Sequence, residues 1–255
     1  MRNLSSLMAA TGLLLGIAAH TDARAADIAI LAAAAIQEPF EAVAHAFEGE
    51  SGNKVKVTFG SVGAIAAKLK AGEKADLVIS STAVVAATEK EGTVRPGSRA
   101  VVGRAEIGIA VREGTPVPDI ATTEAVKKTL LAAKSVSFTS PAGGGTAATF
   151  VNGLLDRLGL AEAIKKKAVM FNTGREVVAA LAKGDAEIGI AFTTEFVPVK
   201  GIKIVGKLPR EIEFVNEYSA YIPAANLAAE PAIALLAYLA RPASRETFRA
   251  AGVAP

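Results

Sequence analysis

The sequence predicts an α/β fold, because short apolar strands alternate with amphipathic helices along most of the chain. The first strand is expected at Asp27–Leu31. It continues through residues 32–35 into a helix over 37–49, whose apolar residues Phe40, Val43 and Phe47 recur at helical spacing. Alternation of this kind favours a parallel sheet covered by helices.

The next units repeat the pattern. Lys54–Phe59 (KVKVTF) alternates as a strand does, residues 60–63 form a turn, and a helix over 64–71 stops at Gly72. Ala75–Ile79 is a third strand, and Ser80, Ser81 and Thr82 follow it as a helix cap.

The second half of the chain contains another set of strand and helix units. The two sets of units span residues 27–105 and 108–212, and the C-terminal part of the chain would then return to the first set. Two segments, near 106–111 and 217–223, would cross between the two sets and form a hinge. We therefore expect a lobe of residues 26–107 plus 217–255 and a second lobe of residues 108–216. Further strands are expected at 106–111, 135–138, 169–172, 187–192 and 202–205, and an extended segment at 213–223. Helices are expected at 123–133, 175–183 and 231–239, and a further long helix is expected to end near residue 158.

The first 25 residues have the three parts of a secretory signal peptide. Arg2 supplies the positive charge, residues 7–19 form the apolar region, and Ala23–Ala25 is a small-x-small cleavage pattern. The alternative is a membrane anchor, but a spanning helix needs about 20 apolar residues and this run is shorter. We expect cleavage after Ala25 or Ala26 and a periplasmic protein that is not inserted in a membrane.

Composition excludes several classes of function. The chain has no cysteine, so it lacks the residue to which a bacterial lipoprotein attaches its lipid. The balance of 28 basic and 25 acidic residues, with 5% aromatics and no tryptophan, gives neither the basic patch nor the stacking platform of a nucleic-acid-binding protein. We found no metal-ligand spacing, nucleophile elbow or phosphate-binding loop, and expect no metal and no cofactor.

The loops after the strands are the candidate site, because ligands of open α/β sheets bind at the carboxyl ends of strands, near helix N-termini. Several of these loops are rich in glycine, serine or threonine, which suits an anion pocket lined by backbone, although helix capping alone also selects these residues. The loops are 32–36, 60–63, 80–82, 140–147, 173–177 and 192–195.

The order of these loops resembles the periplasmic molybdate-binding protein family. The likeness lies in LAAAAI at 31–36, FGSVG at 59–63 and ADLVIS at 75–80, and continues in GIAF at 189–192 and KGIKIV at 200–205. It covers nearly all of the chain after residue 26. It implies a two-lobed type II periplasmic binding fold with mixed sheets, a hinge of two crossing segments, a small anionic solute, an ABC permease as partner and a monomer.

The site departs from the family at its side chains. Two serines that hold the oxyanion are matched by Ala35 and by Val62, with Ser61 just before it, and a tyrosine is matched by Phe192. Only backbone contacts at Ala147 and Val177 can survive these substitutions. A desolvated dianion needs several directed donors, so molybdate itself is disfavoured.

Other residues could supply replacement chemistry. Arg175 begins a helix beside Thr173 and Gly174, and a guanidinium fork suits a carboxylate. It is equally well explained as a solvated arginine. Further hydroxyl donors, each of which could instead be a helix cap, are Ser61, Ser80, Ser81, Ser140 and Thr146, with Asn172 and Thr194 as additional polar residues.

The sequence leaves three functions open. The first is a solute-binding component of a transporter that binds a small organic carboxylate. The second follows from a branch of the same family that the chain resembles at PGSR (96–99) and AVREGTPVPD (110–119), and which includes aconitate isomerase. There Arg175 would clamp the substrate and Glu195, Glu176 or Ser140 could move the proton, with no base singled out. The third is an exported structural protein, which would have a filled cleft.

Overall fold

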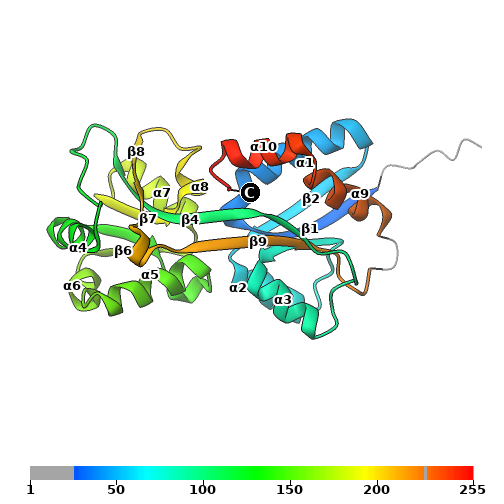
Figure 1. Ribbon diagram of the computed structural model, residues 1–255, viewed down its shortest axis with the longest axis horizontal. Helices are drawn as coiled ribbons and strands as arrows, with labels where there is room; N and C mark the ends of the chain where they lie inside the picture. The colour runs from blue at the N-terminus through cyan, green and yellow to red at the C-terminus, as the bar shows by residue number, and fades with distance from the viewer. Residues whose placement is uncertain (1–25, 227–228, 255) are drawn as a thin grey trace, which may run out of the picture.

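The computed structural model describes residues 26–226 and 229–254, which form a mixed β-sheet flanked by helices (Figure 1). The predicted signal peptide at 1–25 lies outside the described residues. The strands are β1 (Asp27–Ala33), β2 (Lys54–Gly60), β3 (Leu77–Ser81), β4 (Ala100–Arg112), β5 (Val136–Thr139), β6 (Ala168–Phe171), β7 (Ile188–Phe192), β8 (Ile202–Lys207) and β9 (Val215–Tyr221).

The helices connect these strands and cover the two faces of the sheet. Within the described residues, none is long and apolar enough to cross a membrane. The α-helices are α1 (Gln37–Ser51), α2 (Val62–Lys70), α3 (Thr82–Lys90), α4 (Thr123–Ala132), α5 (Thr146–Arg157), α6 (Ala161–Lys165), α7 (Gly174–Lys183), α8 (Thr193–Phe196), α9 (Glu230–Leu239) and α10 (Pro242–Ala250), with 3-10 turns η1 (Ala34–Ile36), η2 (Pro141–Gly143) and η3 (Arg210–Ile212).

The strand order is β2-β1-β3-β9-β4-β7-β5-β6, with β8 paired to β4. β1 is parallel to β2 and β3, and β5 is parallel to β6 and β7. Strands β3 and β7 are buried along their whole length, as expected for parallel strands covered by helices on both faces. The predicted parallel sheet is therefore correct for these strands, but β4 and β9 are antiparallel to their neighbours.

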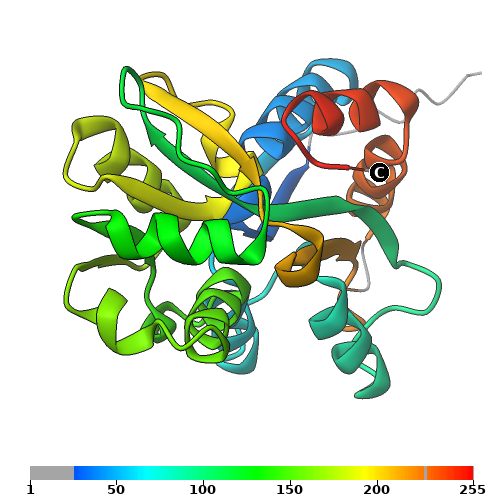
Figure 2. The same cartoon turned by 60° about the vertical axis from the view of Figure 1, so that its left-hand side comes forward.

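Strands β4 and β9 join two lobes (Figures 1 and 2). We call β1–β3 with α1–α3, α9 and α10 the first lobe, and β5–β8 with α4–α8 the second lobe. The first half of β4, Ala100–Glu106, pairs with β9, and its second half, Ile107–Val111, pairs with β7. The two predicted crossing segments, near 106–111 and 217–223, lie in these adjacent antiparallel strands, but they do not pair with each other, because β9 pairs with residues 100–106 of β4. The exact lobe boundaries, after residues 107 and 216, stay a prediction.

Some element boundaries differ from the expectation. β4 begins at Ala100, six residues before the predicted strand, and pairing with β9 holds this less regular part in the sheet. α2 begins at Val62, inside the predicted turn, because the Ser61 hydroxyl accepts a hydrogen bond from the Ala64 amide at 3.1 Å. Ser81 is the N-cap residue of α3, but its side chain makes no capping bond.

The C-terminal end packs back onto the hinge. α10, which the sequence pattern did not predict, leads to a tail in which Ala254 and Arg104 of β4 exchange backbone hydrogen bonds of 2.7 and 2.8 Å. Tyr238 of α9 packs edge-on against Phe47 of α1, with ring centroids 5.4 Å apart. These contacts attach the returning chain to the first lobe.

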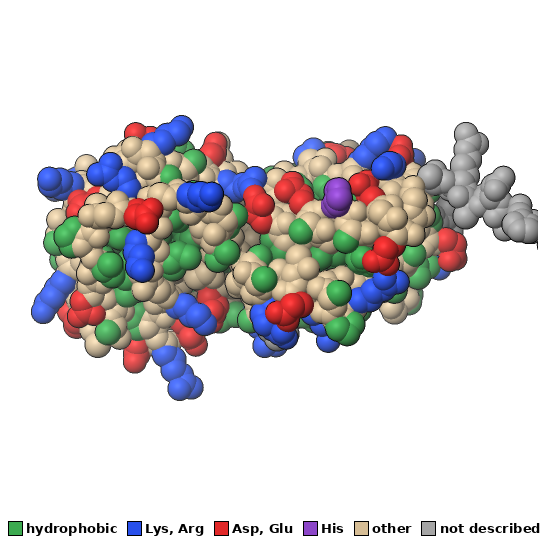
Figure 3. Space-filling view, turned by 90° about the horizontal axis from the view of Figure 1, so that it is seen from above, with side chains coloured by type: hydrophobic (Ala, Val, Ile, Leu, Met, Phe, Trp, Pro, Cys, Tyr) green, Lys and Arg blue, Asp and Glu red, His purple; other side chains and the backbone are tan. Residues whose placement is uncertain are grey.

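Charged residues are dispersed on the surface. In the face shown in Figure 3, Lys and Arg side chains alternate with Asp and Glu over both lobes and form no single basic area. His45 of α1 is exposed. Among the described residues no group of His, Cys, Asp or Glu side chains is arranged to hold a metal ion.

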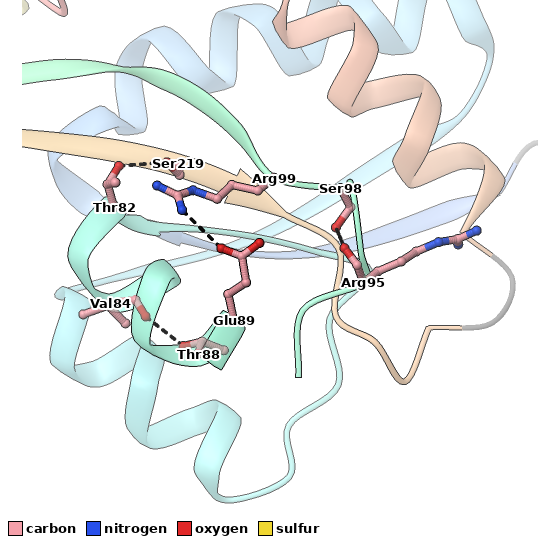
Figure 4. A network of polar contacts seen from close by, with 8 residues as sticks. All are labelled: Thr82, Val84, Thr88, Glu89, Arg95, Ser98, Arg99 and Ser219. Atoms are coloured by element: carbon pink, nitrogen blue, oxygen red, sulfur yellow. Dashed lines mark hydrogen bonds and ion pairs between the residues drawn. The ribbon is translucent and has the colours of Figure 1, made fainter. Parts of the chain in front are cut away.

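Ser98 fixes the end of β9 (Figure 4). Its hydroxyl accepts a hydrogen bond from the Ile222 amide at 3.1 Å and donates to the Arg95 carbonyl at 2.7 Å. Arg99, the next residue, pairs with Glu89 of α3 at 3.2 Å. The PGSR segment therefore connects α3 to the strand that crosses between the lobes, which gives this sequence a structural role.

We predict that Ser98→Ala lowers the free energy of unfolding by about 1–3 kcal/mol, because it leaves a buried backbone amide without its acceptor. Urea unfolding followed by circular dichroism measures the change. Thr247→Ala, which removes an exposed hydroxyl bonded within α10, is the control. A loss for Ser98→Ala no larger than that of the control would contradict this role.

Candidate functional site

A pocket lies between the two lobes, where the carboxyl ends of β1, β2, β5, β6 and β7 meet the starts of the following helices. Both lobes and the crossing strand β9 contribute to its wall. The lining residues are Ala33, Ala34, Ala35, Gly60, Ser61, Val62, Thr139, Gly145, Thr146, Ala147, Asn172, Thr173, Gly174, Phe192, Glu195 and Tyr218.

Three helices of eight or more residues, α2, α5 and α7, begin at this pocket. Their first amides carry partial positive charge and favour an anion. Gly145 is the N-cap residue of α5 and has no side chain that could accept a hydrogen bond from the amides of the first turn. These amides are therefore not capped by their own N-cap residue. Thr139 adds a hydroxyl that is buried and, among the described residues, has no hydrogen-bond partner.

The lobes contact each other directly at the edge of the pocket. Ser61 donates its hydroxyl proton to the Gly143 carbonyl, and the Gly63 amide donates to the Gly144 carbonyl at 3.0 Å. A Cβ atom at Gly63 would lie 2.5 Å from the Gly144 carbonyl oxygen, so this approach requires glycine. On another side, Thr194 donates to the Ala35 carbonyl at 2.6 Å. The structure is therefore a closed form of the cleft.

Glu195 of α8 is a buried carboxylate at the pocket wall, with 8% of its surface exposed. One of its oxygens accepts a hydrogen bond from the Phe192 amide at 3.1 Å. Burial raises the pKa of Glu195 to about 7, and the Phe192 amide and the Arg175 charge oppose that rise. Gly174 makes room for the carboxylate, because a Cβ atom there would lie 2.0 Å from its Oε2 atom.

The rings of Phe192 and Tyr218 line the hinge side of the pocket, and Phe214 packs against Phe192 outside this lining. Phe192 lies 6.2 Å from Tyr218 of β9, edge to face, and Phe214 stacks on Phe150 at 4.6 Å. Burial raises the pKa of Tyr218 above its ordinary value. The Glu195 charge adds to this rise, while polar contacts with Asn216 and Thr146 oppose it. Tyr218 is therefore a neutral phenol that brings a hydroxyl group to the pocket.

Arg175 stands at the mouth of the cleft. Its guanidinium pairs with Glu38 of α1, across the lobes, and both side chains are partly exposed, at 43% and 40%. The two residues line a neighbouring pocket that shares Glu195 and Ala35 with the first. Since the pair is partly solvated, its contribution to stability is small.

Residues 28–254 match the family of bacterial extracellular solute-binding proteins. The chain belongs to this family. It is 31% identical over 233 residues to an aconitate isomerase from Pseudomonas sp., covering 89% of this chain and 87% of the relative. It is 24% identical over 230 residues to the molybdate-binding protein ModA of Escherichia coli strain K12, covering 85% of each.

A solved structure of a molybdate-binding protein has the same fold. The periplasmic molybdate-binding protein of Azotobacter vinelandii superposes with a TM-score of 0.73 at 19% identity, over 89% of this chain and 99% of that protein. The resemblance to molybdate-binding proteins and the two-lobed type II periplasmic binding fold are thus confirmed, whereas the ligand has to be inferred from the pocket of this chain.

The solute-binding fold brings six of the predicted ligand residues to the pocket: Ala35, Ser61, Val62, Thr146, Ala147 and Phe192. Asn172 also lines it, and Arg175 and Thr194 line the neighbouring pocket.

The other predicted ligand residues lie elsewhere or have other partners. Ser80 and Ser81 are buried within β3, and Ser140 caps the turn η2 by accepting from the Ala142 amide at 3.3 Å. Val177 is in the core, and its amide donates to the Thr173 carbonyl at 3.3 Å. The Glu176 carboxylate accepts from the Thr173 amide at 2.9 Å as part of a capping box.

Sequence reasoning missed two pocket residues, Thr139 and Tyr218. Thr139 is the last residue of β5, one position before the candidate loop 140–147. Tyr218 is inside β9, and only the pairing of β9 with β3 and β4 brings it to the cleft. The position of Tyr218 in the predicted crossing segment was the one available signal.

We predict that Glu195 makes the folded protein progressively less stable as pH rises from about 4.5 to 7. In the unfolded chain the Glu195 carboxyl loses its proton near 4.5, whereas the folded protein keeps it to about 7, so the folded state binds more protons in this range. Over this range the raised pKa of Glu195 lowers the free energy of unfolding by about 3 kcal/mol. Urea unfolding of wild type and Glu195→Gln at several pH values measures it.

The glutamine variant should lack this part of the pH dependence, so its stability relative to wild type should increase between pH 4.5 and 8. Glu91→Gln, which removes an exposed carboxylate beyond α3, is the matched control. A constant difference between wild type and Glu195→Gln across the range would rule out a raised pKa for Glu195.

Proposed function

We propose that this protein is a periplasmic solute-binding protein whose cleft holds a small organic carboxylate for uptake through an ABC permease. The observation that carries the proposal is the convergence of the N-termini of α2, α5 and α7 on a pocket that also contains the Thr139 hydroxyl, which has no hydrogen-bond partner among the described residues. Oriented amides and a free hydroxyl are suited to an anion. Membership of the solute-binding family supports transport as the context.

The lining of the pocket supports an organic anion over a tetrahedral oxyanion. The family positions that carry hydroxyls in molybdate binders are Ala35, Val62 and Phe192 in this chain. An oxyanion would lose hydration against these apolar side chains and would gain fewer directed donors than hydroxyls at the same positions would give it. A carboxylate attached to a carbon skeleton can place its charge at the helix N-termini and its carbon atoms against the apolar wall.

A second function, interconversion of cis- and trans-aconitate, is favoured by a separate observation. Glu195 places a group that can accept a proton at the wall of the cleft. The chain is also 31% identical to an aconitate isomerase over 89% of its length. This activity and carboxylate binding use the same pocket, so an enzyme and a transport component differ here only in the fate of the bound ligand.

The periplasmic location rests on the signal-peptide pattern at 1–25 and on the relatives. Cleavage after Ala25 or Ala26, a monomeric state and the lobe boundaries stay predictions.

A ligand screen tests the proposal. We expect cis-aconitate, trans-aconitate or another di- or tricarboxylate to raise Tm of the protein lacking residues 1–25, by about 5 °C at a hundredfold excess over Kd. Molybdate and sulfate should give no shift. Thermal unfolding in the same buffer with each sodium salt measures this, and a shift with molybdate alone would contradict the proposal.

We further predict that Arg175 binds the carboxylate after release from Glu38. Arg175→Ala should then weaken the ligand by about 10-fold or more, as expected for loss of a charge-assisted hydrogen bond. Glu38→Gln should leave the affinity unchanged or raise it, because it frees the guanidinium. Isothermal titration measures both. Equal weakening by the two variants would show that the pair only holds the lobes together.

Thr139 can be tested against a matched neighbour. Ser137 lies on the same strand, is also buried and has an unpartnered hydroxyl among the described residues, but it does not line the pocket. We predict that Thr139→Val weakens ligand binding by about 3- to 10-fold, whereas Ser137→Ala leaves Kd unchanged. If both variants bind the ligand like wild type, the hydroxyl of Thr139 has no part in the site.

A further inference from the structure

Glu195 is poorly suited to a cleft that only binds anions. Its carboxylate lies at the wall of the pocket into which the N-termini of α2, α5 and α7 open, and a negative charge there opposes a bound carboxylate. The described residues give it a single hydrogen bond, from the Phe192 amide at 3.1 Å. A glutamine could accept the same bond without the charge, so the acid itself needs an explanation.

The surrounding structure keeps the carboxylate in place and accessible to the pocket. Gly174 lies against it so closely that any side chain at that position would overlap the carboxylate. The backbone of Phe192 fixes one of its oxygens. The other oxygen has no hydrogen-bond partner among the described residues. Its lone pairs are therefore available to a ligand, while the carboxylate itself is held in place.

We propose that Glu195 accepts and returns a proton in an allylic isomerisation of an unsaturated carboxylate held in the cleft, with aconitate as the substrate to test. This inference rests on the proposed function, because it requires a carboxylate in the same pocket.

The reaction balances with one carboxylate and no other reactant. A Glu195 oxygen takes a proton from the methylene carbon of cis-aconitate, and the electron pair of that C–H bond spreads over the adjacent carbon–carbon double bond and carboxylate. The protonated Glu195 then gives the proton to the former vinyl carbon. The double bond has moved by one position, the product is trans-aconitate, and Glu195 is again ionised.

The groups around Glu195 support this role. Arg175 on α7 is the cation that acts on it, Tyr218 on β9 faces it as a neutral phenol, and Glu38 on α1 pairs with that arginine. A pKa of about 7 lets the side chain act as base and then as acid near neutral pH. The amides at the start of α5 are placed to stabilise charge that develops on the carboxylate oxygens.

The test compares wild type with Glu195→Gln in two measurements. Proton NMR follows conversion of cis- to trans-aconitate, and isothermal titration measures binding of tricarballylate, a saturated tricarboxylate that cannot isomerise. We expect wild type to turn over, and Glu195→Gln to lose about 100-fold or more of kcat while it binds tricarballylate at least as tightly as wild type. Glu91→Gln is the control for loss of an exposed carboxylate.

The pH profile of the wild type gives an independent readout if the variant does not fold. Because the base must be ionised, kcat/KM should rise with pH and level off above about 7. Retention of more than a tenth of kcat by Glu195→Gln, or a flat profile from pH 5 to 8, would exclude Glu195 as the base. Tricarballylate binding without any turnover of aconitate overturns the isomerisation and leaves carboxylate binding intact, whereas no binding of either compound overturns the proposed function.

Discussion

The antiparallel pairing of β4 with β9 is the contact on which the arrangement of the cleft depends. Each strand belongs to the sheet of the first lobe along part of its length, and β4 continues into the sheet of the second lobe by pairing with β7 and β8. The backbone hydrogen bonds between β4 and β9 therefore fix where the lobes meet. Since β9 carries Tyr218 into the pocket, the same strands that form the hinge also form one wall of the site.

Opposing charges meet in the cleft. The starts of three helices favour a negative ligand, while Glu195 is an acid buried among them. Burial holds the proton on this carboxyl up to about neutral pH, which lowers the repulsion that a bound anion would meet.

Most strands and helices could be predicted because their patterns are local, as in the alternation of β2 and the apolar spacing of α1. The pocket residues at strand ends followed from the fold class. What could not be predicted depends on contacts distant in sequence: the start of β4 needs β9, and Arg175 meets Glu38 across 137 residues. The burial of Glu195 belongs here too, because acids at helix starts are usually exposed and only the packed lobes cover this one.

The two lobes present different chemistry to the ligand. The first lobe contributes Ala33, Ala34, Ala35 and Val62, and its one hydroxyl, that of Ser61, is bonded to Gly143. The second lobe contributes its polar groups from several elements: Thr139, Thr146, Asn172, Thr173 and Glu195. A tetrahedral oxyanion is best held by side-chain donors from both lobes, whereas here the first lobe offers mainly apolar side chains. A molecule with carboxylates at one side and a carbon skeleton at the other matches it, so the asymmetry between the lobes supports our proposal that the ligand is an organic acid.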